Sequence, residues 1–312
     1  MRSVYQWRLG SRTLELGKRT LVMGVVNVTP DSFSDGGLYI DAARAVAFAE
    51  RLLDEGATII DVGGESTRPG ASVAALTEVR GGDLSAPAEV SPPASAVSED
   101  EERRRVLPVI RDLKKRRPEA VISVDTYKSS VAKAAVAEGA EIVNDISGFR
   151  WDPKMANTLA ELKAGAVLMH TRGRPDEWRN LPPIGDPVLL IKRELRQWAE
   201  AATLAGIKRD RLVLDPGFGF GKSFDENYPL LAHFADLQQL GFPLLAGVSR
   251  KSFLGRTLAR GGKDAPAEER LYGTLAAEVA LILKGAHILR THDVRAAAEA
   301  ARVADAILAS GG

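Results

Sequence analysis

The sequence predicts an α/β protein built as a single (β/α)8 TIM barrel, with an N-terminal β-hairpin plugging the bottom of the barrel. Three observations lead to this prediction. Eight short apolar runs recur along the 312 residues, and each ends in a polar or charged residue. Amphipathic segments precede most of these runs and close on glycine, which accepts the left-handed backbone past a helix end. Alternating strands and helices indicate a parallel sheet, and eight strands favour its closure into a barrel.

Residues 1–17 predict the hairpin. The stretches VYQWRL and RTLELG alternate around Gly10-Ser11, a pair typical of a tight turn. The barrel is expected to follow, so that residues 1–312 make one predicted domain. One stretch interrupts the alternation of predicted strands and helices. Residues 71–97 are rich in Gly, Pro, Ala and Ser and lack helical or strand periodicity. We interpret it as an inserted flexible loop, and a functional lid is the alternative.

The predicted helices have recognisable ends. Ser98 and Glu101 form the capping-box pattern that opens the second helix, and Asp41 and Asp293 occupy positions expected for N-caps. Pro118 ends the second helix, since proline cannot continue it. The other predicted ends fall on glycines, at Gly56, Gly139, Gly165, Gly206, Gly241 and Gly285.

Composition excludes several classes of function. The 42 basic and 41 acidic residues give a net charge of +1, which predicts neither a nucleic acid nor a membrane as partner. With no cysteine, the chain has no disulfide, thiolate nucleophile or cysteine-based zinc site. No apolar stretch approaches the length of a membrane span, and the first residues do not resemble a signal peptide. A cytoplasmic enzyme is therefore expected.

The polar residues that end the apolar runs are the candidate site. Active sites of such barrels lie at the carboxyl ends of the strands. A core strand gains nothing from finishing on Asn, Asp or Arg unless that side chain faces something polar. In chain order, the runs end at Asn27, Glu65, Asp125, Asn144, His170, Asp215, Ser249–Lys251 and Arg290–His292.

Two glycine-containing loops follow the first two strands. The carboxamide of Asn27 can ligate a hard cation or hold a phosphate oxygen, and the following Phe33 could cover a flat ring. The alternative is an ordinary turn rich in turn-forming residues. In the second loop, GGESTRPGA, Arg68 suits recognition of a carboxylate or phosphate, with a solvated surface arginine as the alternative.

The later strands offer two kinds of polar group. Asp125, Asn144 and Asp215 can read the hydrogen-bonding edge of a heterocycle, whereas a helix-capping role is the alternative for any one of them. Positive charge follows in SRKS (249–252) and RTH (290–292), the quadrant where phosphate groups commonly lodge in such barrels. Lys251 and His292 are the candidates there.

Other conspicuous residues are given structural interpretations. Arg250 fits a surface cation. His233 and His287 are expected to be structural, while His170 fits either role. The stretch DPGFGFGKS imitates a phosphate-binding P-loop, but Pro216 stands where that motif needs glycine, and no strong helix is predicted directly after it.

The motifs resemble those of the dihydropteroate synthase family of pterin-binding β/α barrels. They are NVTPDSFSDGG, GGESTRPGA, SVDTYKSSVAKAAVAEGAEIVNDISG, LDPGFGFGKS, GVSRKSFLG and RTHD, in this order along essentially the whole chain. The resemblance implies condensation of 6-hydroxymethyl-7,8-dihydropterin pyrophosphate with p-aminobenzoate to give 7,8-dihydropteroate and pyrophosphate. It further implies Mg²⁺ as cofactor, a Mg-assisted dissociative displacement, sensitivity to sulfonamides and a homodimer.

The resemblance also implies roles for individual residues. Asn27 would hold the metal, and Asp125, Lys251, Arg290 and His292 would be catalytic. Pterin contacts would come from Asp125, Asn144, Asp215 and Lys251, and diphosphate contacts from Arg290 and His292. The p-aminobenzoate side would be formed by Phe33, Thr67, Arg68, Pro69, Phe220 and Ser252. Met169 and Gly247 would complete the substrate-binding set.

Two other functions remain open from the sequence. A methyltetrahydrofolate-dependent methyltransferase uses a similar pterin-binding barrel, but it would need the pterin-reading residues without the diphosphate cluster of Asn27, Arg290 and His292. A non-catalytic paralogue that binds pterins would keep the same residues. A scaffold role fits poorly with so many polar strand ends.

Overall fold

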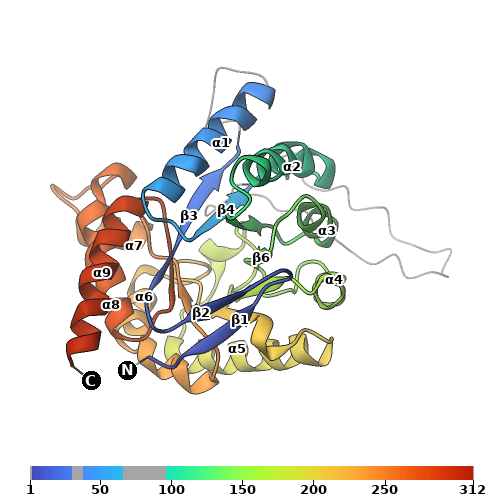
Figure 1. Ribbon diagram of the computed structural model, residues 1–312. Helices are drawn as coiled ribbons and strands as arrows, with labels where there is room; N and C mark the ends of the chain where they lie inside the picture. The colour runs from blue at the N-terminus through green and yellow to red at the C-terminus, as the bar shows by residue number, and fades with distance from the viewer. Residues whose placement is uncertain (1, 30–37, 66–95, 312) are drawn as a thin grey trace.

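The computed structural model describes residues 2–29, 38–65 and 96–311, and its elements follow the predicted order (Figure 1). A two-stranded hairpin comes first, formed by β1 (Tyr5–Arg8) and β2 (Thr13–Leu16). An eight-stranded parallel sheet follows, formed by β3 (Leu21–Asn27), β4 (Ile59–Gly63), β5 (Val121–Asp125), β6 (Ile142–Asp145), β7 (Gly165–Met169), β8 (Leu212–Asp215), β9 (Leu245–Ala246) and β10 (Ile288–Thr291).

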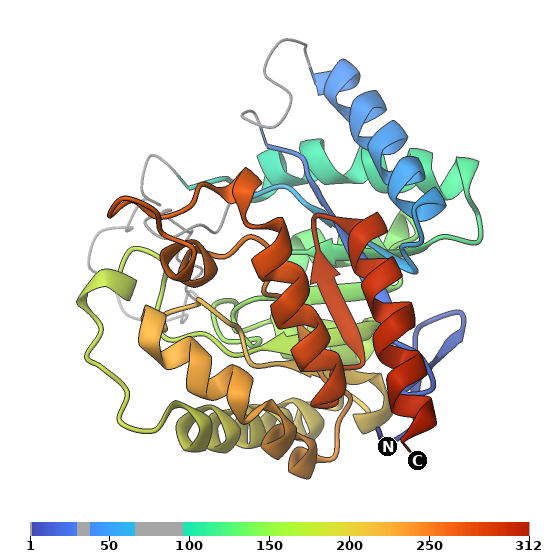
Figure 2. The same ribbon diagram turned by 90° about the vertical axis from the view of Figure 1, so that its left-hand side faces the viewer.

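Helices connect and surround the strands. They are α1 (Leu38–Asp54), α2 (Glu99–Arg116), α3 (Ser129–Ala137), α4 (Met155–Leu162), α5 (Pro187–Leu204), α6 (Phe224–Ala232), α7 (Ser252–Thr257), α8 (Leu271–Leu283) and α9 (Val294–Ser310). Short 3-10 helices lie at Trp178–Asn180, Arg209–Arg211, Phe234–Leu240 and Ala267–Glu269. Figure 2 shows α8 and α9 side by side next to β10. Within the described residues, no helix is long and apolar enough to cross a membrane.

The sheet closes on itself into a barrel. Its hydrogen-bonded order is β8-β7-β6-β5-β4-β3-β10-β9. The two edge strands, β8 and β9, meet through a parallel bridge between Leu214 and Leu244, where the Leu214 amide donates to the Pro243 carbonyl at 3.0 Å. The predicted (β/α)8 barrel is therefore confirmed, and the carboxyl ends of all eight strands face the same mouth.

The hairpin covers the opposite end of the barrel, as predicted. Trp7 and Leu9 pack in one buried cluster with Leu16 and with residues from every barrel strand, and the Trp7 indole donates to the Arg211 carbonyl at 2.8 Å. Gly165 leaves room for this contact, because a Cβ there would lie 2.4 Å from the Leu9 side chain. The lower end of the barrel is thus sealed by apolar side chains.

The barrel interior changes from apolar to polar along the strand direction. Met23, Ile59 and Val121 form part of the lower layer, whereas Asp61 and Ser123 occupy the next inward position on their strands. Apolar side chains of the alternate, outward-facing positions pack against the helices in a separate cluster. Only the upper layers can therefore bind a polar ligand.

Several predicted helix ends need correction. Ser98 accepts from the Glu101 amide at 3.2 Å, but the Glu101 carboxylate pairs with Arg105 instead of returning to Ser98. Asp41 lies inside α1, which begins at Leu38. Helix α4 ends with Lys163 in the left-handed conformation, so Gly165 opens β7 instead of closing a helix.

One further correction concerns the segment after Ser223. A helix does follow Ser223 directly, since Ser223 and Glu226 form a capping box at the start of α6. The rejection of a P-loop then depends on Pro216 alone. Most of the predicted insertion 71–97 lies outside the described residues, and helix α2 begins shortly after it, at Glu99.

Candidate active site

Arg290 is the centre of the polar network in the barrel mouth. Its Nε donates to Asp61 Oδ2 at 2.7 Å and its Nη2 donates to Asp125 Oδ2 at 2.7 Å. Asn144 Nδ2 donates to the same Asp61 oxygen at 3.0 Å. Burial lowers the pKa of Arg290, but Asp61 and Asp125 outweigh it and raise the pKa, so the guanidinium stays charged. Strand ends that are far apart in sequence thus form one hydrogen-bonded cluster.

Asp61 is a functional candidate that the sequence analysis missed. It is fully buried in the middle of β4, and its Oδ1 has no partner among the described residues. A charged residue inside the apolar run TIIDVGG was the available signal, whereas the predicted site contained only residues at the polar ends of such runs. Asp61 fixes the direction of Arg290, because the Nε–Oδ2 bond leaves the rest of the guanidinium facing Asp125.

Asn27 lies beside Asp125 at the mouth. A Cβ added to Gly63 would stand 3.4 Å from Asp125 Cβ and 3.8 Å from Asn27 Oδ1, so this glycine keeps open the space between them. The carboxamide oxygen is a hard donor of the kind that Mg²⁺ accepts alongside phosphate oxygens and water. Within the described residues, no group of three or more His, Cys, Asp or Glu side chains could hold a metal. A cation at Asn27 would therefore take most of its ligands from substrate and water.

Asp215 and Lys251 form the opposite wall. Asp215 Oδ1 accepts from the Gly217 amide at 2.7 Å, and Lys251 Nζ donates to the Phe218 carbonyl. Burial lowers the pKa of Lys251 to about 7 against the raising effect of Asp215, and burial raises the pKa of Asp215. Gly247 lies between this pair and Arg290, since its added Cβ would be 4.0 Å from Asp215 Oδ2 and 3.7 Å from Arg290 Cβ.

An apolar floor lies next to these polar groups. Met169 is buried in a cluster with Tyr127, Ile146 and Trp151, against which Phe220 packs. The Lys251 ammonium lies 4.3 Å from the centre of the Phe220 ring. Flat apolar side chains beside donors and acceptors suit a planar heterocycle, whose faces need apolar contact and whose edge needs hydrogen bonds. Two of these residues, Met169 and Phe220, belong to the substrate-binding set that the family resemblance implied.

His292 is held by Ser249. The Ser249 hydroxyl accepts from the His292 backbone amide at 3.1 Å and lies 3.1 Å from Nδ1. With its oxygen accepting from the amide, the hydroxyl can donate its hydrogen to Nδ1, which leaves the ring proton on Nε2. Burial, then Arg290 and Arg250, lower the pKa of His292 to about 4. His292 is therefore a neutral hydrogen-bond donor at neutral pH and not the cation that the sequence suggested.

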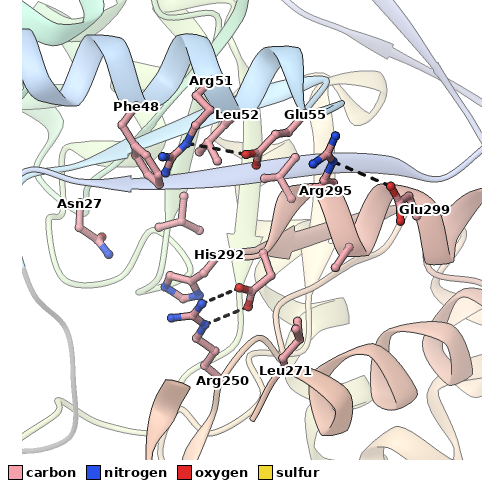
Figure 3. Close-up of a pocket in the computed structure, with 14 residues that line it drawn as sticks. Asn27, Phe48, Arg51, Leu52, Glu55, Arg250, Leu271, His292, Arg295 and Glu299 are labelled. Carbon is pink, nitrogen blue, oxygen red and sulfur yellow. Dashed lines mark hydrogen bonds and ion pairs between the residues drawn. The ribbon is translucent and has the colours of Figure 1, made fainter. Parts of the chain in front are cut away.

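Arg250 differs from its prediction as a surface cation. Its Nε and Nη2 donate to the two carboxylate oxygens of Asp293, at 2.9 and 2.5 Å. Arg250, His292 and Asn27 line one cavity of about 660 Å³ between α1 and α9 (Figure 3). Asp293 stands at the N-cap position of α9, as predicted, but its side chain makes no capping bond because it is engaged by Arg250.

The remaining histidines lie outside the cluster. His170 is buried, contacts Glu194 at 3.0 Å and stacks on Trp198, and burial lowers its pKa to about 3. His287 Nδ1 accepts from the Leu244 amide at 3.1 Å, which supports the structural role expected for it. His233 follows α6.

The structure describes only part of the residue set that the family resemblance implies for p-aminobenzoate. Ser252 begins α7 and lines a second cavity, of about 500 Å³, with Trp178 and Phe224. Trp178 meets the Phe220 ring edge-on at 5.2 Å. The candidates Phe33, Thr67, Arg68 and Pro69 lie outside the described residues.

The two described ends of the second loop are joined by Lys128. This fully buried lysine donates to Glu65 at 2.8 Å, to the Val97 carbonyl at 2.7 Å and to Glu102 at 2.6 Å. Glu65 precedes the segment 66–95, and Val97 and Glu102 follow it. The polar end predicted at Glu65 is thus an anchor of the loop and not a member of the central cluster.

Glu278 gives a testable pH dependence of stability. It lies buried on α8 below Thr291, and burial raises its pKa to about 8. The folded state therefore favours the protonated carboxyl, and the stability from this group is complete below pH 4.5 and is lost as pH rises through 8. We expect Glu278→Gln to raise the free energy of unfolding by on the order of 2 kcal/mol at pH 8 and little at pH 5.

Urea unfolding at both pH values measures this difference, with exposed Glu268→Gln as the control. Equal stability of Glu278→Gln and the natural chain at pH 8 would contradict the expectation.

The chain is similar to proteins of known activity. A family described as "Pterin binding enzyme" matches residues 23–79 and 83–292. The dihydropteroate synthase of Bacillus subtilis (strain 168) is 43% identical over 299 residues, which cover 96% of this chain and 92% of the relative.

Two solved structures extend the likeness to three dimensions. A dihydropteroate synthase of Xanthomonas albilineans with 4-aminobenzoic acid has 42% identity and a TM-score of 0.82, over 97% of this chain and 99% of that one. That of Yersinia pestis, in a sulfonamide drug complex, has 37% identity and a TM-score of 0.83, over 98% and 99%.

Proposed function

Because the chain belongs to the pterin-binding enzymes and, among them, to the dihydropteroate synthase family of transferases, we propose that it joins 6-hydroxymethyl-7,8-dihydropterin pyrophosphate to p-aminobenzoate. The products are 7,8-dihydropteroate and pyrophosphate. One observation carries the proposal: four strands and the loop after β9 bring together at one mouth of the barrel the residues Asp125, Asn144, Asp215, Arg290 and Lys251.

The pterin ring is assigned to the space between these residues. Asp125, Asn144 and Asp215 supply acceptors and a carboxamide for the amino-pyrimidine edge, and Lys251 supplies a donor. Met169 and Phe220 supply apolar contact for a ring face. A site built on so many buried hydrogen-bonding groups rejects ligands that leave them unpaired.

The diphosphate is assigned to Asn27, Arg290 and His292. The Nε2–H of neutral His292 donates a hydrogen bond, and the guanidinium of Arg290 supplies positive charge. Mg²⁺, when bound, would be held by Asn27 and by diphosphate oxygens and would supply positive charge to the leaving group.

The reaction needs a good leaving group more than a strong base. The bond from the pterin methylene to diphosphate oxygen breaks first, and the electron pair stays with the diphosphate. The amine nitrogen of p-aminobenzoate then bonds to the methylene and loses a proton to solvent. Asp125 stabilises the positive pterin in between, and the network around Arg290 is fixed before the reaction begins.

The test is release of pyrophosphate from the pterin diphosphate, p-aminobenzoate and Mg²⁺, with 7,8-dihydropteroate identified by mass. We expect both products in equal amounts. Methyl transfer from methyltetrahydrofolate without pyrophosphate release would support the methyltransferase alternative. Pterin binding without any product, by folded protein, would support the non-catalytic paralogue.

The pKa of Lys251 predicts a pH profile. The protonated ammonium donates to the pterin, and its pKa is lowered to about 7, so the free enzyme loses the donor as pH rises through 7. We expect kcat/KM for the pterin diphosphate to fall on the alkaline side of 7. Lys251→Arg keeps the positive charge, so the fall of kcat/KM should move to higher pH. A fall at an unchanged pH would contradict the assignment of Lys251 to the pterin.

Sulfonamides are expected to compete with p-aminobenzoate. The motif match at Phe33 and Thr67–Pro69 motivates this expectation, and the Yersinia pestis relative was solved in a sulfonamide complex. Initial rates at several p-aminobenzoate concentrations measure the type of inhibition. Noncompetitive inhibition, or none, would count against the assigned p-aminobenzoate side.

The homodimer and the cytoplasmic location stay predictions. Exposed apolar side chains on neighbouring helices give the homodimer a place to form, with Tyr272 on α8 and Val303 and Ile307 on α9. Burial of this face against a second copy would remove them from water.

A further inference from the structure

Arg250 is held in an unusual backbone conformation. Its φ is +57°, a left-handed conformation that residues with a Cβ avoid. Its amide donates to the Thr274 hydroxyl at 3.0 Å, and its carbonyl accepts from Arg270 Nη1 at 2.8 Å. Hydrogen bonds on both sides of the residue therefore fix this conformation, which directs the side chain across the next strand end instead of into solvent.

The side chain joins two loops of the proposed diphosphate site. Arg250 follows β9 and Asp293 follows β10. The two hydrogen bonds from the Arg250 guanidinium to the Asp293 carboxylate, called the fork below, link the loops. Ser249 and His292, one residue before each partner, form a second link at 3.1 Å. The fork occupies Nε and Nη2 of Arg250, and this leaves Nη1 to donate to another acceptor.

Arg250 faces the same cavity as Asn27 and His292, two of the three residues assigned to the diphosphate. Figure 3 shows its guanidinium directly beside the His292 ring, with the Asn27 carboxamide pointing toward His292 from across the cavity. Arg250 also acts electrostatically on His292, whose pKa it helps to lower. An anion bound between Asn27 and His292 would lie next to Arg250.

The charges of the cluster leave a role for another cation. Arg290 is shared between Asp61 and Asp125, and His292 is neutral at neutral pH. Among the described residues, little uncompensated positive charge then faces a multiply charged leaving group. Arg250 differs from Arg290 because its ion pairs within the described part of the chain involve one carboxylate, that of Asp293, and its side chain is 37% exposed.

We propose that Arg250 is a ligand of the diphosphate group, to which its Nη1 donates, and that Asp293 holds the guanidinium in position and limits its free charge. The inference rests on the proposed function, since it deepens the assignment of the diphosphate site. Asp293 acts through Arg250 and is a positioning residue.

Binding of inorganic pyrophosphate to the full chain, in buffer with Mg²⁺ and without other substrate, tests the proposal by calorimetry. We expect Arg250→Met to raise the dissociation constant for pyrophosphate at least about tenfold, and Arg250→Lys to raise it less. Asp293→Asn keeps the shape but removes the negative charge, so pyrophosphate should bind as tightly as to the natural chain or more tightly. The control is Arg295→Met, an exposed arginine of the same cavity paired with Glu299, and it should change binding less than twofold.

Arg250→Met should weaken pyrophosphate binding and Asp293→Asn should not. This difference distinguishes a ligand of the diphosphate from a residue that only links the two loops. Arg250→Met and Asp293→Asn weaken the same fork, so equal losses of pyrophosphate binding would overturn the proposal. So would unchanged binding by folded Arg250→Met, or no binding by the natural chain. Thermal unfolding of each variant shows whether it is folded, and Arg250→Lys serves in place of Arg250→Met if the latter is not.

Steady-state kinetics give a second readout. Arg250→Met should raise KM for the pterin diphosphate and leave KM for p-aminobenzoate unchanged, whereas equal increases would contradict a diphosphate ligand. Pyrophosphate binding needs no turnover. If the natural chain binds pyrophosphate through Arg250 but forms no dihydropteroate, the proposed function fails and the inference stands.

Discussion

Lys251→Met is expected to lower kcat/KM by on the order of 10³ while leaving the fold intact. The side chain keeps its length and apolar stem but loses the ammonium that lies over Phe220 and beside Asp215. Asp215 then remains as a buried carboxyl with a raised pKa and without the cation that lowers that pKa most, so its protonated form is favoured. Both the donor and the ionised acceptor for the pterin edge would be lost in a single variant.

Pyrophosphate release and circular dichroism together measure this effect. Lys263→Met, in an exposed turn of the segment between α7 and α8, is the matched control and should retain full activity. A folded Lys251→Met variant with the activity of the natural chain would remove the main support for the pterin assignment.

Arg290→Met should have the largest effect on stability, about 3–5 kcal/mol, and should abolish activity. Arg290 neutralises Asp61 and Asp125, which lie in the barrel interior with side-chain exposures of 0% and 16%. Removing the guanidinium leaves two carboxyls close together without a cation. One or both must bind a proton to stay buried, so the loss of stability should be smaller at low pH.

A double variant separates the two roles of Arg290. Asp61→Asn combined with Arg290→Met removes one unpaired charge, and urea unfolding should show that stability is partly regained. Activity should not return, because the cation for the diphosphate is still absent. If the double variant is no more stable than Arg290→Met, then Asp61 is not the partner that matters.

The sequence predicted the barrel and most of the cluster for a shared physical reason. Parallel strands place their carboxyl ends at one mouth, so an apolar run ending in Asp125 or Asp215 indicates both a strand and a site. The hairpin was equally visible, because Gly10-Ser11 separates two alternating stretches. These features depend on local pattern and on one topological rule.

What the sequence could not predict depends on distant contacts. The charge of Asp61 within an apolar run is visible in the sequence, but its partner Arg290, 229 residues away, is not. Arg250 was interpreted as a surface cation because nothing near it in the sequence indicates that it pairs with Asp293. The charge of His292 likewise depends on burial and on Arg250 and Arg290, which no local pattern specifies.

The sealed lower end of the barrel has a consequence for how the chain is made. Trp7 reaches the carbonyl of Arg211, and Arg2 pairs with Asp305 in the last helix. Residues 2 and 7 thus make contacts with residues 303 and 204 positions further along the sequence, and contacts this distant in sequence are slow to form. The docking of α9, and not local collapse, should set the moment when the fold is completed, and chains that stop before α9 should leave Arg2 without Asp305.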